Sequence, residues 1–360
     1  MQVKSLRLQQ FRNIDSVTFQ FDERLNVFIG NNGQGKTNII EALVYLSFGQ
    51  SFRVSDDKLM IQNNQDFAKV ESMSSDGLEL SVVISKTGKY ILRNGAVLKR
   101  LSDLIGLMNV IVFHPDDLNF FAQAPRLRRR EIDYELGKYH HESLDYLNQY
   151  RKLLALRNAA LKADQIDPDY ISIIDEKMIT LSIPLIKLRH TFVKQLEKRI
   201  TPLFKQLTKS DLDITFEYKT HVDPNEALED QLRESYQSSY NRDLAFKSSH
   251  VGIHRDDYIF KMNGQAVVET ASQGQRRLLM LAYKFALMNL FIETKGIVPI
   301  LCLDDLFSEL DQEKRDTLFQ YIPSQVQVFV STTDLAFLAS NLRGKVFTIE
   351  NGFVIKEAQL

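Results

Sequence analysis

Cysteine is nearly absent from this chain. Its 360 residues include only one, Cys302, which stands in an apolar run. A single cysteine excludes an internal disulfide and a cysteine-based metal cluster, and it fits a reducing compartment. Long apolar runs are also lacking, since no stretch approaches the roughly 18 to 20 residues that span a bilayer. The N-terminus, MQVKSLRLQQFRN, has no apolar signal-peptide region. We therefore expect a cytoplasmic protein without a membrane partner.

An excess of charge of either sign is lacking too. The chain has 45 Lys and Arg against 46 Asp and Glu, a formal net charge of -1 at pH 7. This balance gives no global electrostatic attraction to DNA or to a membrane surface, so any nucleic-acid surface must be local. Hydrophobic residues at 44% and charged residues at 25% are close to the averages of globular domains, which argues against disorder.

Glycine is missing from most of the middle of the chain. From 126 to 209 the only glycine is Gly137, and helix formers dominate. Apolar residues recur at every seventh position over 179–207, which predicts a helix with a seam for a partner helix. Pro184 and Pro202 should kink or divide that helix, so we expect a short coiled-coil-like hairpin. Because the chain exceeds the usual size of one hydrophobic core, this segment is predicted to be a helical lobe inserted into another domain.

Alternating apolar and polar residues flank the helical segment. Over 3–29 they predict a hairpin and then a buried strand, and over 66–113 they predict an antiparallel meander. Further strands are expected at 298–303, 326–331, 345–349 and 353–356. The fold class should therefore be α/β, with a mixed sheet, an antiparallel β meander and an inserted, mainly helical second lobe. The expected boundaries are 1–115 with 245–360 for the first lobe and 116–244 for the insertion.

The stretch GNNGQGKT at 30–37 matches the phosphate-loop pattern G-x-x-x-x-G-K-[ST] at every fixed position. The apolar LNVFI before it predicts a strand and NIIEALVYL after it predicts a helix, which is the context that such a loop requires. Small residues let consecutive backbone N–H groups curl around phosphate oxygens at the start of a helix. A glycine-rich turn without a ligand is the alternative. The predicted nucleotide contacts are Gly30, Asn31, Asn32, Gly33, Gln34, Gly35, Lys36, Thr37 and Asn38.

Two of these residues have predicted roles of their own. Lys36 should reach the β and γ phosphates, and the Thr37 hydroxyl should ligate Mg²⁺. A phosphate loop also needs a carboxylate at the end of a neighbouring parallel strand to hold the magnesium shell. Asp304 ends the apolar run VPILCL and is predicted to fill that role.

Asp305 follows immediately and would project toward the γ-phosphate. A carboxylate there can orient or deprotonate the attacking water as a general base. Glu309 also lies nearby in sequence, so the identity of the base stays open between the two. Taken alone, a solvated strand end or a helix cap would explain Asp304 and Asp305 equally well.

Ser272-Gln273-Gly274-Gln275 opens a long amphipathic helix far downstream of the phosphate loop. A hydroxyl, a glycine that allows close approach and free N–H groups at a helix start make a second phosphate-binding device. An ordinary N-cap serine is the commoner explanation of such a stretch. Together with the phosphate loop and Asp304, however, the arrangement resembles the ABC-type ATPases, whose S-G-G-Q signature completes the nucleotide site of a second subunit. Gln273 replaces one glycine of that signature.

Further stretches narrow the resemblance to the RecF family, bacterial recombination mediators related to the structural-maintenance-of-chromosomes proteins. Besides GNNGQGKTN, SQGQRR and LDDLFSELD, motifs similar to that family and in its order are Phe11-Arg12-Asn13, Pro115-Asp116-Asp117-Leu118, Pro125 with Arg128-Arg129, and GIHRDD at 252–257. The resemblance spans essentially the whole chain. It departs at Ile253, where the family motif has proline, and at Ala122-Gln123-Ala124, which lacks the glycine usual before Pro125.

The resemblance to RecF implies a function. It implies an ABC-type ATPase head that uses ATP and Mg²⁺, and an ATP-dependent homodimer that clamps duplex DNA, especially at the boundaries of single-stranded gaps. It also implies RecR and RecO as partners in loading RecA, and a location at the nucleoid. Hydrolysis would reset the dimer as a weak, DNA-stimulated ATPase. Because Asp305 is one methylene shorter than the glutamate of fast ABC ATPases, turnover should be slow.

The resemblance also implies roles for site residues. Ser272, Gly274 and Gln275 of one subunit would cover the nucleotide of the other, with Lys36, Asp305 and Ser272 as catalytic residues. Ser308–Asp311 resembles the loop that ABC ATPases place at the dimer interface. ABC transporters keep a switch histidine where this chain has Ser331-Thr332-Thr333, which suggests that Thr332 or Thr333 faces the γ-phosphate.

A local basic cluster is the first candidate for DNA contacts. Its members are Arg126, Arg128, Arg129 and Arg130, which together can neutralise several phosphates. A solvated helix start paired with Glu131, Asp133 and Glu135 is the alternative. A second basic set is more simply explained as a solvated face and consists of Lys187, Lys194, Lys198, Lys205 and Lys209. His254 and Arg255 suit an interface or a place near the nucleotide better than a metal site.

Two other functions use the same ATPase motifs. An ATPase coupled to nucleic-acid cleavage would need a carboxylate metal cluster beyond Asp304, and the chain has no appended domain to hold one. An energising subunit of a membrane transporter fits the meander and the helical lobe poorly. Copurification with a membrane protein would favour that second alternative.

Overall fold

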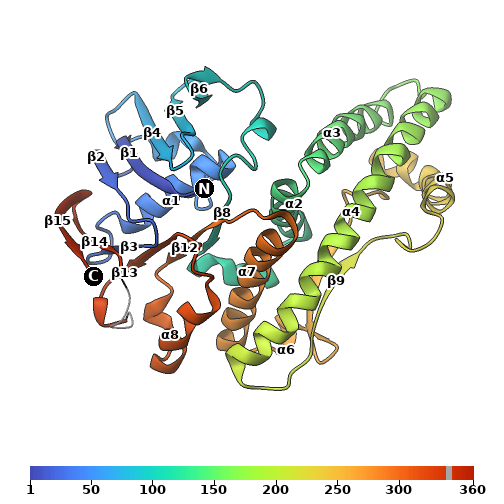
Figure 1. The fold of residues 1–360 in the computed structure, drawn as a ribbon. Helices are drawn as coiled ribbons and strands as arrows, with labels where there is room; N and C mark the ends of the chain where they lie inside the picture. Colours follow the sequence, from blue (N-terminus) through green and yellow to red (C-terminus); the bar gives the residue numbers. More distant parts are fainter. Residues whose placement is uncertain (338–342) are drawn as a thin grey trace. The chain divides into compact units, whose positions relative to one another are not determined.

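The chain folds into two compact units in the computed structural model, which describes residues 1–337 and 343–360. The first unit consists of Met1–Asp117 and Met280–Leu360, and the second is Leu118–Leu279 (Figure 1). A mainly helical lobe is thus inserted into an α/β unit, as the sequence predicts. The expected boundary at 244 differs from this division, because strands within 257–266 pair with a strand that ends at Lys219 and so join the insertion.

The first unit contains an antiparallel sheet of six strands in the order β2-β1-β4-β5-β6-β7. Its strands are β1 Val3–Phe11, β2 Ile14–Gln20, β4 Phe67–Ser74, β5 Glu79–Ser85, β6 Gly88–Arg93 and β7 Ala96–Val97. Leu6 and Leu8 of β1 are fully buried whereas Lys4 and Arg7 are exposed, which is the alternation of a sheet with one solvated face. The predicted hairpin and meander are both confirmed. The end of the meander is the exception, because 110–113 belongs to the other sheet.

That second sheet also has six strands, in the order β15-β14-β3-β13-β12-β8. They are β3 Leu25–Ile29, β8 Val110–Phe113, β12 Ile300–Asp304, β13 Val328–Thr332, β14 Lys345–Glu350 and β15 Phe353–Gln359. All neighbours pair in parallel except β14 and β15. Every residue of β8, β12 and β13 is buried, as expected for central parallel strands covered on both faces. The predicted C-terminal strands are confirmed.

Helix α1, Lys36–Phe48, packs against both sheets of this unit. Its side chains Ile39, Ile40, Leu43 and Leu46 share one hydrophobic core with β1 and with the parallel sheet. A helix that is buried on nearly all sides has a fixed position. The N-terminus of α1, which directly follows the phosphate loop, is therefore held in place. The other α-helices of the unit are α8 Gln312–Leu318 and most of α7, Gln273–Lys295. Short 3₁₀ helices lie at Asp57–Met60, Leu101–Asp103, Phe307–Glu309, Phe319–Tyr321 and Leu335–Phe337. A further 3₁₀ helix, Pro115–Phe121, has residues in both units.

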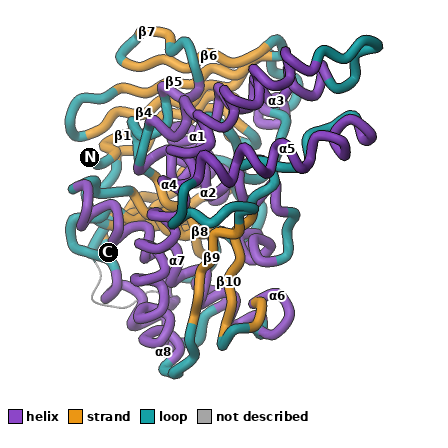
Figure 2. The backbone as a smooth tube through the Cα atoms, turned by 90° about the vertical axis from the view of Figure 1, so that its right-hand side faces the viewer, coloured by secondary structure: helices purple, strands orange, loops and turns teal. Residues whose placement is uncertain are grey.

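The second unit is built on long helices that pack side by side (Figure 1). They are α2 Pro125–Tyr139, α3 Glu142–Ala160, α4 Pro168–Thr208 and α5 Leu228–Phe246, followed by the short α6 Val267–Thr270. The heptad positions of α4, among them Ile179, Ile186 and Ile200, are buried. A small antiparallel sheet lies beside α4 and consists of β9 Ile214–Lys219, β10 Asp257–Met262 and β11 Gln265–Ala266 (Figure 2).

The prolines of α4 do not divide it. Pro184 and Pro202 both lie inside one continuous helix of 41 residues, so the predicted short hairpin is wrong in its length. Each proline removes one backbone hydrogen bond of the helix. The buried side of α4 packs on α3, α5 and β9, and this tertiary packing outweighs the two lost bonds.

One turn of the second unit tolerates no side chain. Gly252 has φ +118, and a Cβ atom there would overlap the Tyr150 hydroxyl and lie 2.8 Å from the Tyr236 hydroxyl. Both tyrosines are fully buried, so neither can withdraw. Gly264 also has a left-handed φ, +81, but a Cβ there would meet no atom within 4 Å.

This contrast gives a stability prediction. Gly264→Ala should cost only the strain of a left-handed alanine, about 1 kcal/mol. Gly252→Ala adds steric overlap with buried groups and should cost about 3 kcal/mol or more of the unfolding free energy. Urea unfolding followed by circular dichroism measures both. Equal losses in the two variants would show that the close contacts at Gly252 do not matter.

Candidate functional site

The loop 30–35 joins β3 to α1 and has the shape of a phosphate cradle. Gly33 and Gly35 adopt left-handed φ values of +81 and +110, which favour glycine. A Cβ at Gly30 would overlap the carbonyl oxygen of Ile349. The loop is tied to the β14–β15 turn, where Gly352 N–H donates to the Gln34 carbonyl (2.9 Å) and Asn351 N–H donates to Gln34 Oε1 (2.5 Å). The Gln34 side chain therefore braces the loop.

Lys36 is the first residue of α1 and is 6% exposed. Its ammonium donates to the carbonyl oxygens of Gly30 (2.5 Å) and Asn31 (2.8 Å). Burial lowers the pKa of Lys36, while the nearby carboxylates of Asp305 and Asp304 oppose that shift. The ammonium thus lies against the backbone of the loop that is predicted to bind phosphate.

Asp304 and the phosphate loop meet as the sequence predicts. The Thr37 hydroxyl donates to Asp304 Oδ1 at 3.0 Å. Asp304 ends β12 and is 3% exposed, and it pairs in register with Ser331 of β13, the strand that separates β12 from β3. A threonine hydroxyl beside a carboxylate supplies the hard oxygen donors that Mg²⁺ prefers, so these two residues fit the predicted metal role. Burial raises the pKa of Asp304, although hydrogen bonds from Ser331 and Thr37 favour its charged form.

Asp305 has an unusual backbone. Its φ is +47, in the left-handed region. Its N–H donates to Ser331 Oγ (2.9 Å), and the Ser308 hydroxyl donates to its carbonyl oxygen (3.0 Å). The side chain of Glu309, the other carboxylate considered as a base, lies outside the described residues. Thr332 is buried, and its hydroxyl donates to the backbone carbonyl of Asp334 (3.1 Å).

Ser272 to Gln275 form a capping box at the start of α7. The Ser272 hydroxyl accepts from Gln275 N–H (3.2 Å), and Gln275 Oε1 accepts from Ser272 N–H (2.8 Å). Within the chain, the ordinary N-cap explanation is therefore correct for Ser272. Ser272, Gln273 and Gly274 are all exposed, and a Cβ at Gly274 would meet no atom within 4 Å. These residues belong to the second unit, whereas the phosphate loop belongs to the first.

The turn Phe11-Arg12-Asn13 contributes residues next to the phosphate loop that the sequence reasoning left without a role. Arg12 makes a two-pronged ion pair with the fully buried Glu41 of α1 (2.9 and 2.6 Å). Asn38 Nδ2 donates to Asn13 Oδ1 at 2.7 Å, and Arg53 donates to Asn38 Oδ1 at 2.8 Å. An open polar pocket of about 830 Å³ is lined in part by Arg12, Asn13, Asn38 and Arg53. Glu41, a charge among apolar neighbours, is the sequence signal for this network.

A second buried polar cluster follows β8. His114 Nε2 lies 3.0 Å from Asp117 Oδ1, and Lys284 Nζ of α7 lies 3.5 Å from Asp117 Oδ2. Burial would raise the pKa of Asp117, but the charges of His114 and Lys284 outweigh it and lower the pKa to about 2. Phe113, the last residue of β8, pairs with Leu303 of β12. The next residue in each chain segment, His114 after β8 and Asp304 at the end of β12, therefore lies at the same edge of the sheet. Asp117, which belongs to the Pro115–Leu118 motif quoted above, thus holds the histidine that lies at the same sheet edge as Asp304.

The four arginines proposed for DNA contacts divide into two pairs. Arg128 forks onto the Asp257 carboxylate (2.9 and 2.7 Å), and Arg129 donates to the Asp256 carbonyl. These two therefore tie α2 to the start of β10, Arg128 through a carboxylate and Arg129 through a backbone carbonyl, and neither partner is among the acidic residues weighed in the sequence. Arg126 and Arg130 are exposed and lie four residues apart, on one face of α2.

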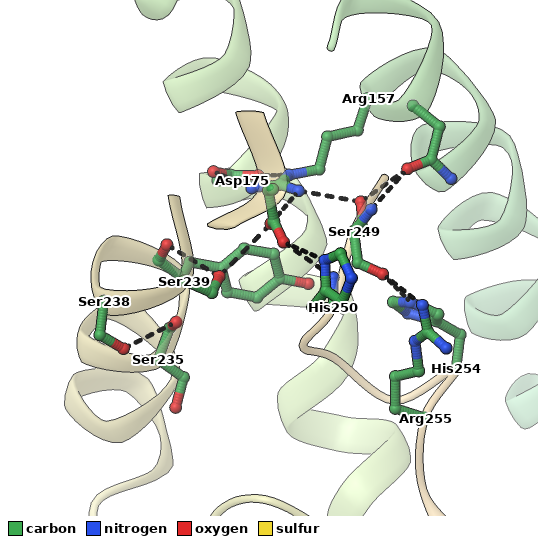
Figure 3. Close-up of polar contacts among 12 residues, drawn as sticks. Arg157, Asp175, Ser235, Ser238, Ser239, Ser249, His250, His254 and Arg255 are labelled. Atoms are coloured by element: carbon green, nitrogen blue, oxygen red, sulfur yellow. Dashed lines mark hydrogen bonds and ion pairs between the residues drawn. The ribbon is translucent and has the colours of Figure 1, made fainter. Parts of the chain in front are cut away.

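His254 and Arg255 belong to a polar network inside the second unit (Figure 3). His254 Nε2 lies 3.2 Å from the Ser249 carbonyl, which can only accept, so Nε2 carries the proton and Nδ1 accepts from the Tyr150 hydroxyl (3.0 Å). Burial lowers the pKa of His254 to about 4. Arg255 is exposed and donates to the same Ser249 carbonyl (2.9 Å). The ring of His254 is thus occupied by protein partners rather than arranged for a metal.

Arg157 is the centre of that network. It is fully buried and bonds Asp175 (2.5 Å), Asp243 (2.6 Å) and the Ser249 hydroxyl (2.9 Å), so it joins α3, α4, α5 and the loop after α5 (Figure 3). Among the residues whose side chains the structure describes, a set that leaves out Glu309, Asp316 and 338–342, no group of three or more His, Cys, Asp or Glu could hold a metal ion. In the same part of the chain, no helix has the length and apolar character needed to cross a membrane.

The burial of Asp304 generates a stability prediction. Its folded-state pKa lies above that of the unfolded chain, so its ionisation at neutral pH destabilises the folded state. Asp304→Asn keeps the shape and an accepting oxygen without the charge. In buffer with EDTA and no nucleotide, the variant should melt roughly 2–4 °C higher than wild type.

The pH dependence provides the check. The gain of Asp304→Asn should shrink as the pH falls toward about 4, where the wild-type carboxyl becomes protonated in both states. Asp15→Asn, at an exposed aspartate of β2, is the control and should leave the melting temperature at pH 7 unchanged. A lower melting temperature for Asp304→Asn at pH 7 would contradict the assignment of a strained buried charge.

Comparison with known proteins now identifies the family. The family described as RecF/RecN/SMC N terminal domain matches residues 2–352. Over 99% of this chain and the whole of the relative, the sequence is 37% identical to the DNA replication and repair protein RecF of Bacillus pumilus. The protein of the same name from Bacillus subtilis is 34% identical over 99% of this chain and 100% of its own length.

Solved structures agree with the sequence relatives. The RecF structure described as the recombination mediator protein RecF-ATP in the RecFOR pathway superposes with a TM-score of 0.91, at 27% identity, over 99% of both chains. A RecF-ATPrS structure of the same description gives 0.87 over 98% of this chain and 97% of that one. An Smc head bound to the C-winged helix domain of ScpA shares the fold, with a TM-score of 0.58 at 16% identity, over 100% of this chain and 98% of that one. The chain therefore belongs to the RecF family of SMC-like ATPases.

Proposed function

We propose that the chain is an ATP-driven, DNA-binding switch of recombinational repair. The observation that carries this proposal is the junction of the phosphate loop with Asp304, where the Thr37 hydroxyl lies 3.0 Å from the buried carboxylate. The relatives support the biological setting, because the Bacillus RecF proteins are named for DNA replication and repair. The solved RecF structures were described with ATP and with an ATP analogue.

The phosphate loop binds the triphosphate. Its backbone N–H groups and the start of α1 provide positive potential for phosphate oxygens. The Lys36 ammonium, which donates to the carbonyls of Gly30 and Asn31, exchanges those acceptors for β and γ oxygens of ATP. Thr37 and Asp304 hold Mg²⁺, which when bound neutralises charge that develops on the phosphates. The pocket of about 830 Å³ beside Asn38 offers room for the ribose and base.

Asp305 acts on the attacking water. It follows the metal carboxylate directly and is partly exposed, so its carboxylate can accept a proton from water. Its short side chain positions that water less favourably than a glutamate would, which suits a slow timer. A steady-state rate of many turnovers per second would contradict this role.

The other half of the site comes from a second copy of the chain. Ser272 and Gly274 are exposed at the first turn of α7, and nothing within 4 Å of Gly274 requires a glycine there. A glycine inside a helix costs about 1 kcal/mol relative to alanine, so its presence points to an object outside the chain that must come close. The γ-phosphate held by the partner's loop is that object, and Gln275 fixes the Ser272 backbone for the contact.

ATP binding therefore closes a homodimer on duplex DNA, and hydrolysis opens it. The boundary of a single-stranded gap is the proposed target in the cytoplasm, with RecO and RecR as the partners that load RecA. The RecFOR pathway named for the solved relatives supports these partners. We restrict the proposed phosphate contacts on α2 to Arg126 and Arg130, because Arg128 and Arg129 serve the fold.

Sizing by light scattering tests the two-copy site. Wild type should dimerise with Mg²⁺ and ATP and stay monomeric with ADP or without nucleotide. Lys36→Ala removes a phosphate ligand and should not dimerise. Ser272→Arg places a long side chain at the proposed contact and should bind ATP like wild type but remain monomeric.

Ser238→Arg is the matched control for this experiment. Ser238 is an exposed helical serine of α5 in the same unit, so the same substitution should leave ATP-dependent dimerisation intact. Dimerisation of Ser272→Arg with ATP, at wild-type concentration, would refute the two-copy site.

DNA binding by α2 is tested by neutralising its exposed arginines. The double variant Arg126→Gln and Arg130→Gln should weaken duplex binding, and the slope of log affinity against log salt should fall by about 2, one unit for each lost phosphate contact. Fluorescence anisotropy with a labelled duplex measures both. Lys162→Gln with Lys177→Gln removes the same charge from exposed sites of the same unit and should leave the slope unchanged. An unchanged slope for the arginine variant would exclude α2 from the DNA surface.

A further inference from the structure

Ser331 lies at the carboxyl end of β13 and is fully buried. The predicted site gave it no role, since Thr332 and Thr333 were the residues expected to face the γ-phosphate. Its position is fixed by the sheet, because Ser331 pairs in register with Asp304 on the neighbouring parallel strand. It therefore lies at the edge where the carboxyl ends of parallel strands gather functional groups.

The hydroxyl of Ser331 makes two hydrogen bonds of opposite sense. It donates to Asp304 Oδ1 at 2.5 Å, because a carboxylate oxygen only accepts. Its own oxygen accepts from Asp305 N–H at 2.9 Å. One hydroxyl thus connects the side chain of the proposed magnesium ligand to the backbone of the proposed general base.

The second of these bonds acts on a strained residue. Asp305 has φ +47, a left-handed conformation that is unfavourable for a residue other than glycine. The Ser331 oxygen holds its N–H, and the Ser308 hydroxyl holds its carbonyl oxygen (3.0 Å) and approaches Oδ1 (3.3 Å). Strain that is maintained by specific partners at a site is typical of functional backbone. Without the left-handed turn, the Asp305 side chain would point elsewhere.

The first bond shares its acceptor with the phosphate loop. Asp304 Oδ1 accepts from both Thr37 and Ser331, so two hydroxyl groups hold this oxygen in place and restrict the rotation of the carboxylate. Groups that orient a metal ligand in this way set the affinity and the geometry of the metal site. The Ser331 side chain therefore helps to fix both the Asp304 carboxylate and the Asp305 backbone.

We propose that Ser331 is a positioning residue for ATP hydrolysis, holding Asp304 and Asp305 in the single geometry that the reaction needs. This inference rests on the proposed function. In that reaction a water oxygen forms a bond to the γ-phosphorus and Asp305 takes the water proton. The bond from the γ-phosphorus to the bridging oxygen breaks, and ADP leaves with that electron pair. Ser331 itself contacts neither water nor nucleotide and acts through its two neighbours.

Ser331→Ala tests the proposal, because it removes both bonds and only one atom. Turnover of ATP should fall about 10–100-fold, and the Mg²⁺ concentration needed for tight binding of a fluorescent ATP analogue should rise by a similar factor. The affinity for the analogue at saturating Mg²⁺ should stay within about threefold of wild type. The ATP-induced dimer should last longer in proportion to the slower hydrolysis. Ser331→Thr retains the hydroxyl and should restore the Mg²⁺ dependence.

Ser47→Ala is the matched control. Ser47 is also fully buried in the first unit, and its hydroxyl donates to the Met108 carbonyl (2.6 Å) and accepts from Val110 N–H (3.3 Å). Its loss should lower the melting temperature without moving turnover or the Mg²⁺ dependence. If Ser331→Ala does not fold, Ser331→Cys, which is close in size but a weak donor, replaces it with the same expectations.

The outcomes separate this inference from the proposed function. If wild type hydrolyses ATP and Ser331→Ala behaves like Ser47→Ala, the positioning role is wrong and the proposed function stands. If wild type neither binds nor hydrolyses Mg²⁺–ATP, the proposed function fails and the inference with it. If turnover and Mg²⁺ dependence change in Ser331→Ala as expected but the dimer lifetime does not, the positioning role stands, and the part of the proposed function in which hydrolysis opens the dimer is wrong.

Discussion

The carboxylate of Asp304 is the constraint on which the arrangement of the first unit's site depends. A buried charge is unfavourable, and hydrogen bonds from the start of α1 and from β13 offset part of its cost here. Each of these partners belongs to an element whose position is set by the large core around α1. The Asp305 backbone is attached to the same group through Ser331. Packing, hydrogen bonding and the chemistry of the site are thus properties of one local geometry.

The second unit uses buried arginines in a comparable way. Arg157 joins three helices to the loop after α5, and Arg189 joins α2 and α4 to the start of β10 through Asp133 and Asp256. A buried arginine whose partners are removed destabilises a fold strongly, so such residues fix the relative positions of the helices that they connect. The GIHRDD stretch lies between these two centres, which explains why the turn around Gly252 leaves no free space. The composition of this stretch is therefore a requirement of the fold of this unit.

Local patterns predicted the parts of the structure that local physics determines. The phosphate loop, the strand ending at Asp304, the meander and the heptad face of α4 all follow from spacing within a few residues. Contacts between distant segments were not accessible in this way. Asp256 and Asp257 lie far from Arg128 and Arg129 in sequence, so a cluster of arginines looked like a free basic surface. Pro184 and Pro202 suggested a divided helix because the packing that outweighs them comes from α3, α5 and β9. Ser331 looked like any buried strand residue until its register with Asp304 was known.

The capping box at Ser272 has a consequence for the resting protein. In the single chain, the hydroxyl of Ser272 is already satisfied by Gln275 N–H, and the Gln275 side chain returns the bond. A helix start that satisfies its own first turn attracts stray anions weakly, such as free phosphate or the backbone of single-stranded nucleic acid. Because the Ser272 oxygen only accepts in this bond, the hydroxyl hydrogen can still donate to a phosphate in the proposed contact with a partner. The capping box would thus give the first turn of α7 the same shape in the isolated chain as in the proposed dimer, so that the contact would need no local rearrangement.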